Sequence, residues 1–195
     1  MVPSKLELRR TLKGILKELR SSGSQDRKGH LLSNHLLGLI KKLHVDKLDE
    51  KGELNIGGFA PLKDEPNWTS ELLSQYGNNL SFPSLKSNSI KMEFYSCQFD
   101  QLVENSDFGI PILGPPKTVT EVTPDILIIP GLSFSPDGKR LGRGKGFYDY
   151  YLSSFEGIRI GVCFLEQVRT YIPFEEHDQK VDFLVTDEKV TNTRE

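Results

Sequence analysis

The stretch DILIIPG (Asp125–Gly131) decides the fold class of this sequence. It is a short, continuous apolar run rich in β-branched residues, which is typical of a strand buried on both faces of a parallel sheet. Four other segments are also typical of strands: LNIGGFAPL (54–62), SIKMEFYSC (89–97), IRIGVCF (158–164) and VDFLVTD (181–187). We therefore expect a sheet with DILIIPG in its interior.

Segments with helical periodicity lie before and between these strands. PSKLELRRTLKGILKELRSS (3–22) has a buried leucine stripe, and Ser4 and Glu7 fit a capping box at its start. Further helices are expected over His30–Leu43, TSELLSQYG (69–77) and Phe147–Phe155. Strands that alternate with helices predict an α/β fold with helices on both faces of the sheet.

Two segments are expected to be irregular. NSDFGIPILGPPKTV (105–119) is rich in glycine and proline and predicts a loop, and VTNTRE (190–195) predicts a frayed end.

Composition narrows the class of protein. The chain has 195 residues, which suits one domain, and 25 Lys and Arg nearly balance 27 Asp and Glu, so nothing favours binding to nucleic acid or to an anionic membrane. No apolar run reaches the roughly 18–20 residues that span a bilayer, and MVPSKLELRR at the N-terminus lacks the apolar core of a signal peptide. Cys97 and Cys163 suit a reducing compartment. We expect a soluble cytoplasmic protein.

The segment after DILIIPG has the features of an anion site. Gly142, Gly144 and Gly146 alternate with basic residues, and glycines let backbone N–H groups approach an anion closely. The loop follows a strand and ends at a predicted helix N-terminus, two places where ligands and anions gather in α/β proteins. The pattern is neither a Walker loop nor GxGxxG. We interpret it as a polyphosphate site; a flexible surface turn with incidental charge is the alternative.

Carboxylates near this loop are candidate magnesium ligands. Asp149 stands in the first turn of the predicted helix, where Mg²⁺ could bind one or two carboxylates together with phosphate oxygens. Asp178 or Asp182, before and at the start of the last predicted strand, could complete the site. Alternatively, Asp149 caps the helix and Asp178 fixes a turn. Lys5 and Arg9 either reach an external anion or belong to a solvated helix face.

At these residues the sequence resembles the 5-formyltetrahydrofolate cyclo-ligase family, also called methenyltetrahydrofolate synthetases. The resemblance is carried by four segments: PGLSFSPDGKRLGRGKGFYDYYL (130–152), FLEQVRTYIPFEEHDQKVDFLVTD (164–187), KLELR (5–9) and FAPLKDE (59–65). It implies a single domain over residues 1–195, with a Rossmann-like layered α/β/α fold around a mostly parallel, mixed sheet.

The resemblance implies an ATP- and Mg²⁺-dependent cyclisation of 5-formyltetrahydrofolate to 5,10-methenyltetrahydrofolate, with release of ADP and phosphate. It places ATP at Lys5, Arg9, Arg140, Leu141, Gly142, Arg143, Gly144, Lys145, Gly146, Phe147 and Tyr148. It places the folate at Ala60, Glu65, Phe108, Arg143, Gly144, Lys145, Gly146 and Phe147, and magnesium at Asp149 and Asp178. Arg143 and Lys145 are the expected catalytic cations. The expected partners are these small molecules, and the expected state is a monomer or a weak homodimer.

Some positions depart from the family pattern, namely Phe108, Ile112, Leu113 and Phe147. They concern the pterin contacts rather than the class of reaction. Two other functions stay open: a sugar-phosphate isomerase or acyl-CoA transferase of similar architecture, and a non-catalytic nucleotide- or folate-binding module. The first would need a catalytic carboxylate but not the Arg/Lys/Mg²⁺ set, and the second would tolerate loss of Asp149.

Overall fold

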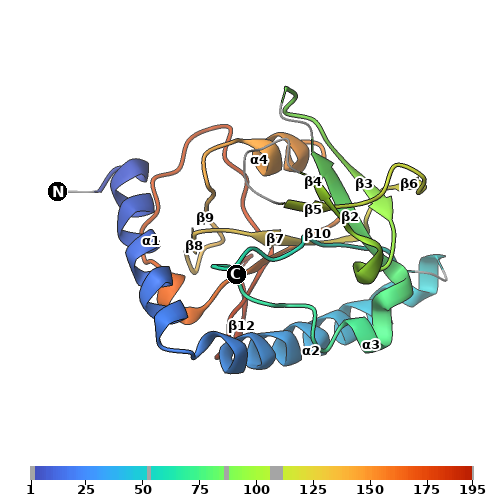
Figure 1. The fold of residues 1–195 in the computed structure, drawn as a ribbon, viewed down its shortest axis with the longest axis horizontal. Coiled ribbons are helices and arrows are strands. Elements are labelled where there is room, and N and C mark those ends of the chain that lie inside the picture. Colours follow the sequence, from blue (N-terminus) through green and yellow to red (C-terminus); the bar gives the residue numbers. More distant parts are fainter. Residues whose placement is uncertain (1–2, 52–53, 86–87, 106–111, 195) are drawn as a thin grey trace.

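A large mixed sheet forms the centre of the structure (Figure 1), which is a computed structural model describing residues 3–51, 54–85, 88–105 and 112–194. The strand order is β12-β11-β10-β7-β1-β2-β3-β6. Neighbours from β11 through β2 pair in parallel, whereas β12, β3 and β6 pair antiparallel at the two sides. The predicted α/β class with a mostly parallel, mixed sheet is therefore confirmed.

The strands of this sheet are short. They are β1 (Ile56–Gly57), β2 (Leu80–Leu85), β3 (Met92–Ser96), β6 (Glu121–Val122), β7 (Ile126–Pro130), β10 (Ile158–Val162), β11 (Phe183–Val185) and β12 (Val190–Asn192). Two small antiparallel pairs accompany the sheet: β4 (Val103–Asn105) with β5 (Ile112–Gly114), and β8 (Ser133–Phe134) with β9 (Arg140–Leu141). The helices are α1 (Lys5–Ser21), α2 (Gln25–Lys51), α3 (Leu73–Tyr76) and α4 (Phe147–Leu152), with 3₁₀ turns at Gly77–Asn79, Phe99–Gln101 and Leu165–Gln167.

Strand β7 shows how the layers form. Its side chains alternate between the two faces of the sheet, as the pleat of a strand requires. Ile126 and Ile128 pack in the core cluster that contains residues of α2 and α3, whereas Leu127 and Ile129 pack in the cluster that contains Leu152 of α4. All four side chains are fully buried. Helices thus cover both faces, and the DILIIPG prediction is confirmed.

Helix α1 lies against the segments that follow the strands. Its buried leucines, Leu8, Leu12, Leu16 and Leu19, pack with Leu132, Leu141, Phe164 and Ile172. The predicted capping box is present, because Ser4 accepts a hydrogen bond from the Glu7 backbone and Glu7 accepts one from the Ser4 backbone. This packing places the first turns of α1 beside the glycine-rich loop.

Several predicted boundaries are wrong. The strand expected over 54–62 is only Ile56–Gly57, and the helix expected over 147–155 ends at Leu152. Helix α2 extends beyond the expected His30–Leu43, and α3 is a single turn within 69–77. In the described part of 105–119, residues 112–114 form β5 instead of loop.

Residues 190–194, the described part of the C-terminal segment, are ordered rather than frayed. Strand β12 pairs antiparallel with β11, and the Arg194 Nε donates a hydrogen bond to Asp182 Oδ1 at 2.9 Å. Ladder bonds and an ion pair hold this end, features that a short polar tail does not reveal in sequence.

Strand β2 has no counterpart in the sequence prediction because Pro83 lies within it. Proline cannot donate a ladder hydrogen bond, so a run that contains it argues against a central strand. In the structure β1 ends opposite Ser81, and Pro83 lies further along, where β1 no longer pairs with β2. Proline is tolerated there because, among the described strands, none pairs with that edge of β2 beyond Ser81.

No helix in the described ranges has the length and apolar character needed to cross a bilayer.

Replacing Leu12 by alanine tests whether the leucine stripe holds α1 in place. Leu12 is fully buried, so Leu12→Ala should lower the free energy of unfolding by about 2–5 kcal/mol. The matched control is Leu6→Ala, because Leu6 on the same helix is 56% exposed and its loss should change stability by less than about 0.5 kcal/mol. Chemical denaturation followed by circular dichroism measures both, and equal effects would contradict the packing of α1.

Candidate functional site

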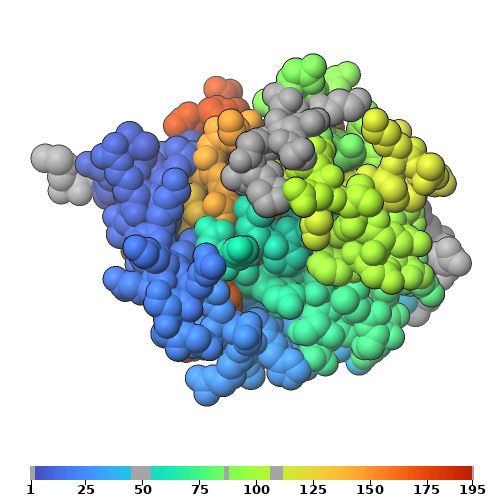
Figure 2. All heavy atoms as spheres, viewed as in Figure 1, coloured from blue at the N-terminus to red at the C-terminus, as the bar shows by residue number. Residues whose placement is uncertain are grey.

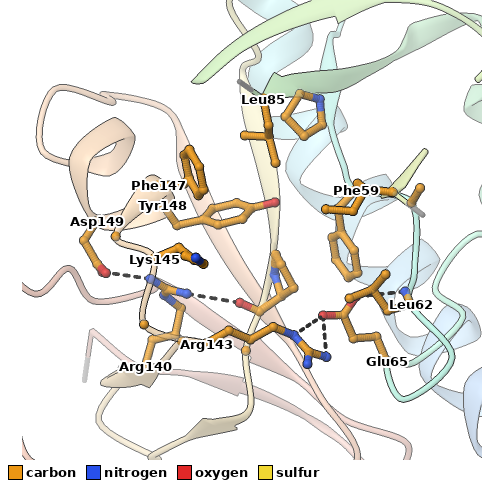
Figure 3. A pocket seen from close by; sticks show the side chains of 18 of the residues that line it. Phe59, Leu62, Glu65, Leu85, Arg140, Arg143, Lys145, Phe147, Tyr148 and Asp149 are labelled. Carbon is orange, nitrogen blue, oxygen red and sulfur yellow. Dashed lines mark hydrogen bonds and ion pairs between the residues drawn. The ribbon is translucent and has the colours of Figure 1, made fainter. Parts of the chain in front are cut away.

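A cavity of about 280 Å³ lies where β7 ends. Its walls come from the segment after β1, from β2 and β5, and from residues 140–149 (Figure 3). Ligands of open α/β sheets bind at this carboxyl edge of the parallel strands. The cavity therefore lies where the sequence analysis expected the polyphosphate loop.

The glycine-rich loop forms one wall of the cavity. Gly144 and Gly146 have φ values of +93° and +76°, conformations that side chains rarely adopt. At Gly142 an added Cβ would lie 2.8 Å from the Arg140 guanidinium. Gly146 is also the residue that precedes α4. The three glycines are thus required by backbone conformation and by close contact.

Arg140 is fixed at the base of the loop. Its Nη2 donates to Asp149 Oδ1 at 2.8 Å, its Nη1 donates to the Pro130 carbonyl at 3.3 Å, and its guanidinium lies 5.5 Å from the centre of the Tyr148 ring. Only 5% of its side chain is exposed. Burying a charge is costly unless it is paired, so these contacts lock Arg140 and both ends of the loop together.

Arg143 lies at the opposite side of the loop, against two carboxylates. Its Nη2 is 2.7 Å from Asp64 Oδ1 and 3.2 Å from Glu65 Oε1, and its Nε is also 3.2 Å from Glu65 Oε1. Glu65 Oε2 accepts a hydrogen bond from the Leu62 backbone N–H at 3.0 Å. This set joins the segment after β1 to the glycine-rich loop, although nearly 80 residues separate them in sequence.

The electrostatics of this pair reflect its burial. Burial raises the pKa of Glu65, although the Leu62 N–H and Arg143 both favour the charged carboxylate. Burial would lower the pKa of Arg143, but Glu65 and Asp64 together raise it above its ordinary value. Arg143 therefore carries a full positive charge at the cavity wall.

The rest of the cavity is largely apolar. Phe59, Leu62, Leu85, Ile112 and Phe147 line it. Figure 3 shows the Tyr148 ring projecting from α4 into this space, with Lys145 beside it. Burial raises the pKa of the Tyr148 phenol, so its hydroxyl stays protonated. The cavity thus combines an apolar wall suited to a planar ring with a cationic loop suited to phosphates.

The structure brings together most of the predicted ligand contacts. Cavity-lining residues include Ala60, Glu65, Arg140, Gly142, Arg143, Gly144, Lys145, Gly146, Phe147, Tyr148 and Asp149. Leu141 is buried just below the loop in the cluster with α1. Phe108 lies outside the described residues, so its folate contact stays a prediction.

The two α1 residues expected to bind ATP, Lys5 and Arg9, differ in their contacts. Arg9 reaches the loop, since its Nε donates to the Gly142 carbonyl at 3.0 Å. Lys5 instead pairs with Asp178 Oδ2 at 2.7 Å and Glu175 Oε1 at 3.0 Å. Figure 2 shows α1, in deep blue, flanking the orange segment that contains the glycine-rich loop and α4. Neither Lys5 nor Asp178 lines the cavity.

The two predicted magnesium ligands do not fit a metal equally well. Asp149 lines the cavity, and its Oδ1 accepts a hydrogen bond from Arg140 Nη2 at 2.8 Å. Asp178 Oδ2 accepts from Lys5 and from the Glu175 backbone N–H at 2.7 Å. No cluster of three or more His, Cys, Asp or Glu suited to a metal occurs within the described residues. Asp149 is therefore suited to be one protein ligand of a Mg²⁺ ion that is also bound by phosphate. Asp178 is instead engaged as the ion-pair partner of Lys5.

Sequence reasoning missed charge partners within and around the site. Asp64 lies in the segment FAPLKDE and has no predicted role, yet it makes the shortest contact to Arg143. The Arg140–Asp149 pair was also missed, although nine residues across a turn into a helix allow such a contact. A lone acid after several cations is the signal that could have suggested it.

A cationic glycine loop facing an apolar wall at the carboxyl edge of a parallel sheet defines an α/β protein whose cavity suits an anionic, ring-containing ligand. The 5-formyltetrahydrofolate cyclo-ligase family model matches residues 2–187, and the chain belongs to this family. The family resemblance of the sequence is thereby confirmed.

Individual relatives agree with this assignment. The chain is 45% identical over 64 residues to the 5-formyltetrahydrofolate cyclo-ligase of Mus musculus, a match covering 30% of this chain and 32% of the relative. It is 38% identical over 79 residues to a probable 5-formyltetrahydrofolate cyclo-ligase of Schizosaccharomyces pombe, covering 34% and 39%. The matched segments thus span about a third of the length of these curated relatives.

A solved structure is similar over nearly the full length. The NMR structure of Aquifex aeolicus 5,10-methenyltetrahydrofolate synthetase matches with a TM-score of 0.73 at 26% identity, covering 98% of this chain and 93% of that one. The fold and the family assignment therefore agree.

The Lys5–Asp178 pair predicts a pH dependence of stability. Burial alone would raise the pKa of Asp178, but hydrogen bonds from Lys5 and from the Glu175 N–H hold it below its ordinary value. The stabilisation is therefore present above the unfolded-state pKa of about 3.9 and is lost as the pH falls through the lower folded-state pKa.

Asp178→Asn should lower the free energy of unfolding at neutral pH by about 1.5–3 kcal/mol, the range for a hydrogen bond to a charged group. The difference from the unsubstituted protein should shrink below about pH 4. Urea unfolding across pH measures this, with Glu176→Gln, an exposed neighbour, as control. A difference that stays constant down to the acid limit would show that the carboxylate charge is not responsible.

Proposed function

We propose that this chain catalyses the ATP-dependent cyclisation of 5-formyltetrahydrofolate to 5,10-methenyltetrahydrofolate, with release of ADP and phosphate. The observation that carries the proposal is the single cavity in which Glu65 and an apolar wall face Arg143, Lys145 and three glycines. One side suits a pterin and the other a polyphosphate. We also expect residues 1–195 to act as a single cytoplasmic domain, as a monomer or a weak homodimer.

The folate side of the cavity would bind and orient the ring. A pterin offers N–H donors, and the Glu65 carboxylate accepts such donors at a depth where its side chain is only 9% exposed. Phe59, Leu85 and Phe147 provide apolar contact for the ring faces. Glu65 would therefore fix the direction of the ring, and with it the position of the formyl group relative to the loop.

The loop side would bind the triphosphate. The charges of Arg143 and Lys145 and the backbone N–H groups of the loop would neutralise negative charge on the transferring phosphoryl group. Arg140 is already held by Asp149 and the Pro130 carbonyl, so we assign it mainly to shaping the loop. Arg9, bonded to the Gly142 carbonyl, would hold the loop from the side of α1.

The reaction that fits this arrangement has two steps. The formyl oxygen on N5 attacks the γ-phosphorus of ATP, ADP leaves, and an imidate phosphate forms. N10 then attacks the formyl carbon, the C–O bond breaks, phosphate leaves with that oxygen, and N10 gives up its proton. Positioning and charge neutralisation supply the catalysis, so no enzyme nucleophile is needed.

The cysteines agree with this absence of a nucleophile. Cys97 and Cys163 are both buried, and burial raises the pKa of each thiol. A reactive cysteine has the opposite character, because the thiolate is the nucleophile.

Magnesium would be held by the phosphates and by Asp149, and when bound it supplies further positive charge to the phosphoryl oxygens. The assignment of Asp178 to the same ion stays a prediction. Two alternatives, an isomerase- or transferase-like enzyme and a non-catalytic binding module, are outcomes of the test below.

The direct test mixes the protein with ATP, Mg²⁺ and 5-formyltetrahydrofolate and follows the near-ultraviolet absorption of the methenyl product. Our proposal requires that band to appear, and ATP hydrolysis to depend on the added folate. Binding of both ligands with neither product would favour the binding module. Hydrolysis of ATP that is indifferent to folate would reject a cyclo-ligase.

Replacing Lys145 removes charge from the loop with little structural cost, because the side chain is exposed. Lys145→Ala should lower kcat/KM for ATP by about 10²-fold, the scale of losing one charged transition-state contact, and leave the circular dichroism spectrum unchanged. Lys13→Ala, an exposed lysine of α1 away from the cavity, is the control and should retain full activity. Near-normal kinetics for Lys145→Ala would contradict the proposal that the loop binds the phosphates of ATP.

A titration of the rate against Mg²⁺ examines the two aspartates separately. Asp149→Asn keeps an oxygen that can accept a hydrogen bond from Arg140 but loses the negative charge. The Mg²⁺ concentration needed for the half-maximal rate should therefore rise by at least about tenfold. Asp178→Asn should show the same shift if it also binds the ion. A variant with unchanged Mg²⁺ dependence removes that residue from the metal site.

A further inference from the structure

Asp64 lies outside the cavity but contacts a residue that lines it. Its Oδ1 is 2.7 Å from Arg143 Nη2, closer than the 3.2 Å that separates the same nitrogen from Glu65 Oε1. Asp64 does not line the cavity, whereas Glu65 and Arg143 do. The guanidinium of Arg143 is therefore shared between one carboxylate outside the cavity and one carboxylate at its wall.

The sharing matters because both oxygens of Glu65 are already in use. Oε2 accepts from the Leu62 N–H, and Oε1 accepts from Arg143. A ligand N–H that approaches Glu65 thus competes with Arg143 for the carboxylate. Arg143 can yield Oε1 without becoming an unpaired charge only if another carboxylate holds it, and Asp64 is placed to do so.

We propose that Asp64 is a positioning residue that holds Arg143 at the mouth of the cavity, so that the Glu65 carboxylate stays available to the N–H donors of the folate. The inference rests on the proposed function, since it names the ligand group that Glu65 accepts. Asp64 acts through Arg143 and need not touch either substrate.

The exposure of the three side chains makes this testable by substitution. The Asp64 and Arg143 side chains are 32% and 36% exposed, whereas that of Glu65 is 9% exposed. Ion pairs at such exposed positions contribute little to stability because water solvates both charges. Loss of Asp64 should therefore leave the protein folded, with an unchanged melting temperature, while the Arg143 guanidinium settles on Glu65 alone.

The experiment measures the affinity for 5-formyltetrahydrofolate by calorimetry in the absence of ATP, so it does not depend on turnover. Asp64→Ala should weaken binding by about tenfold, within the range for one hydrogen bond to a charged group. Asp64→Asn keeps the acceptor oxygen and loses the charge, so its affinity for the folate should lie between those of the unsubstituted protein and of Asp64→Ala. In an Arg143→Ala background, Asp64→Ala should have no further effect, because no guanidinium then competes for Glu65.

The control is Asp137→Asn, which removes the charge of another ion-paired carboxylate, one that contacts Lys139 and Lys180 away from the cavity. It should bind the folate normally. In turnover, Asp64→Ala should raise KM for the folate about tenfold while kcat changes less than about twofold.

Each outcome is decisive. Unchanged or tighter folate binding by Asp64→Ala overturns the proposal, and so does an effect that persists in the Arg143→Ala background. If the unsubstituted protein does not bind 5-formyltetrahydrofolate at all, the proposed function fails, and the role of Asp64 fails with it. Normal binding by the unsubstituted protein together with equal binding by Asp64→Ala rejects the role of Asp64 alone.

Discussion

The buried ion pair between Arg140 and Asp149 is the interaction on which the rest of the site depends. It connects β9, where the glycine-rich loop begins, to α4, where the loop ends, and Arg140 also donates to the last residue of β7. A guanidinium with 5% of its side chain exposed would be costly without a charged partner. The pair therefore fixes the spacing of the two ends, and Gly144 and Gly146 can adopt their positive φ values between them.

Other cations around the cavity are also paired with carboxylates of the same chain. Arg143 lies against Asp64 and Glu65, and Lys5 lies against Asp178 and Glu175. Cations arranged for an anionic ligand are thus paired with carboxylates of the chain itself. Under the proposed function, a polyphosphate that enters such a site would exchange one set of charge partners for another, which limits the cost of keeping the cations close together.

Much of the fold follows from the sequence because its signals are local. The buried run of β7, the capping box of Ser4 and the leucine stripe of α1 each depend on residues a few positions apart. Strand β2 could not be predicted, because its tolerance of Pro83 depends on where the neighbouring β1 ends. The ordered C-terminus likewise depends on distant partners, namely β11 and Asp182.

The residues of the site also divide into those that the sequence predicts and those that only the fold reveals. The glycine-rich loop was identified from its own spacing and charge, and the family resemblance added Glu65 and Ala60, which the fold brings to the same cavity. Partners that depend on tertiary contacts were missed, above all Asp64 for Arg143 and Lys5 for Asp178. Periodicity and composition do not reveal which carboxylate a cation will meet across the fold.

The central claim is that the cavity transfers a phosphoryl group onto the formyl oxygen of the folate. The most direct measurement uses 5-formyltetrahydrofolate labelled with heavy oxygen at the formyl group, together with ATP, Mg²⁺ and the protein, and determines the mass of the released phosphate. Our account predicts that the label leaves in the phosphate, one labelled oxygen for each methenyl product formed. Methenyl product accompanied by unlabelled phosphate would contradict it.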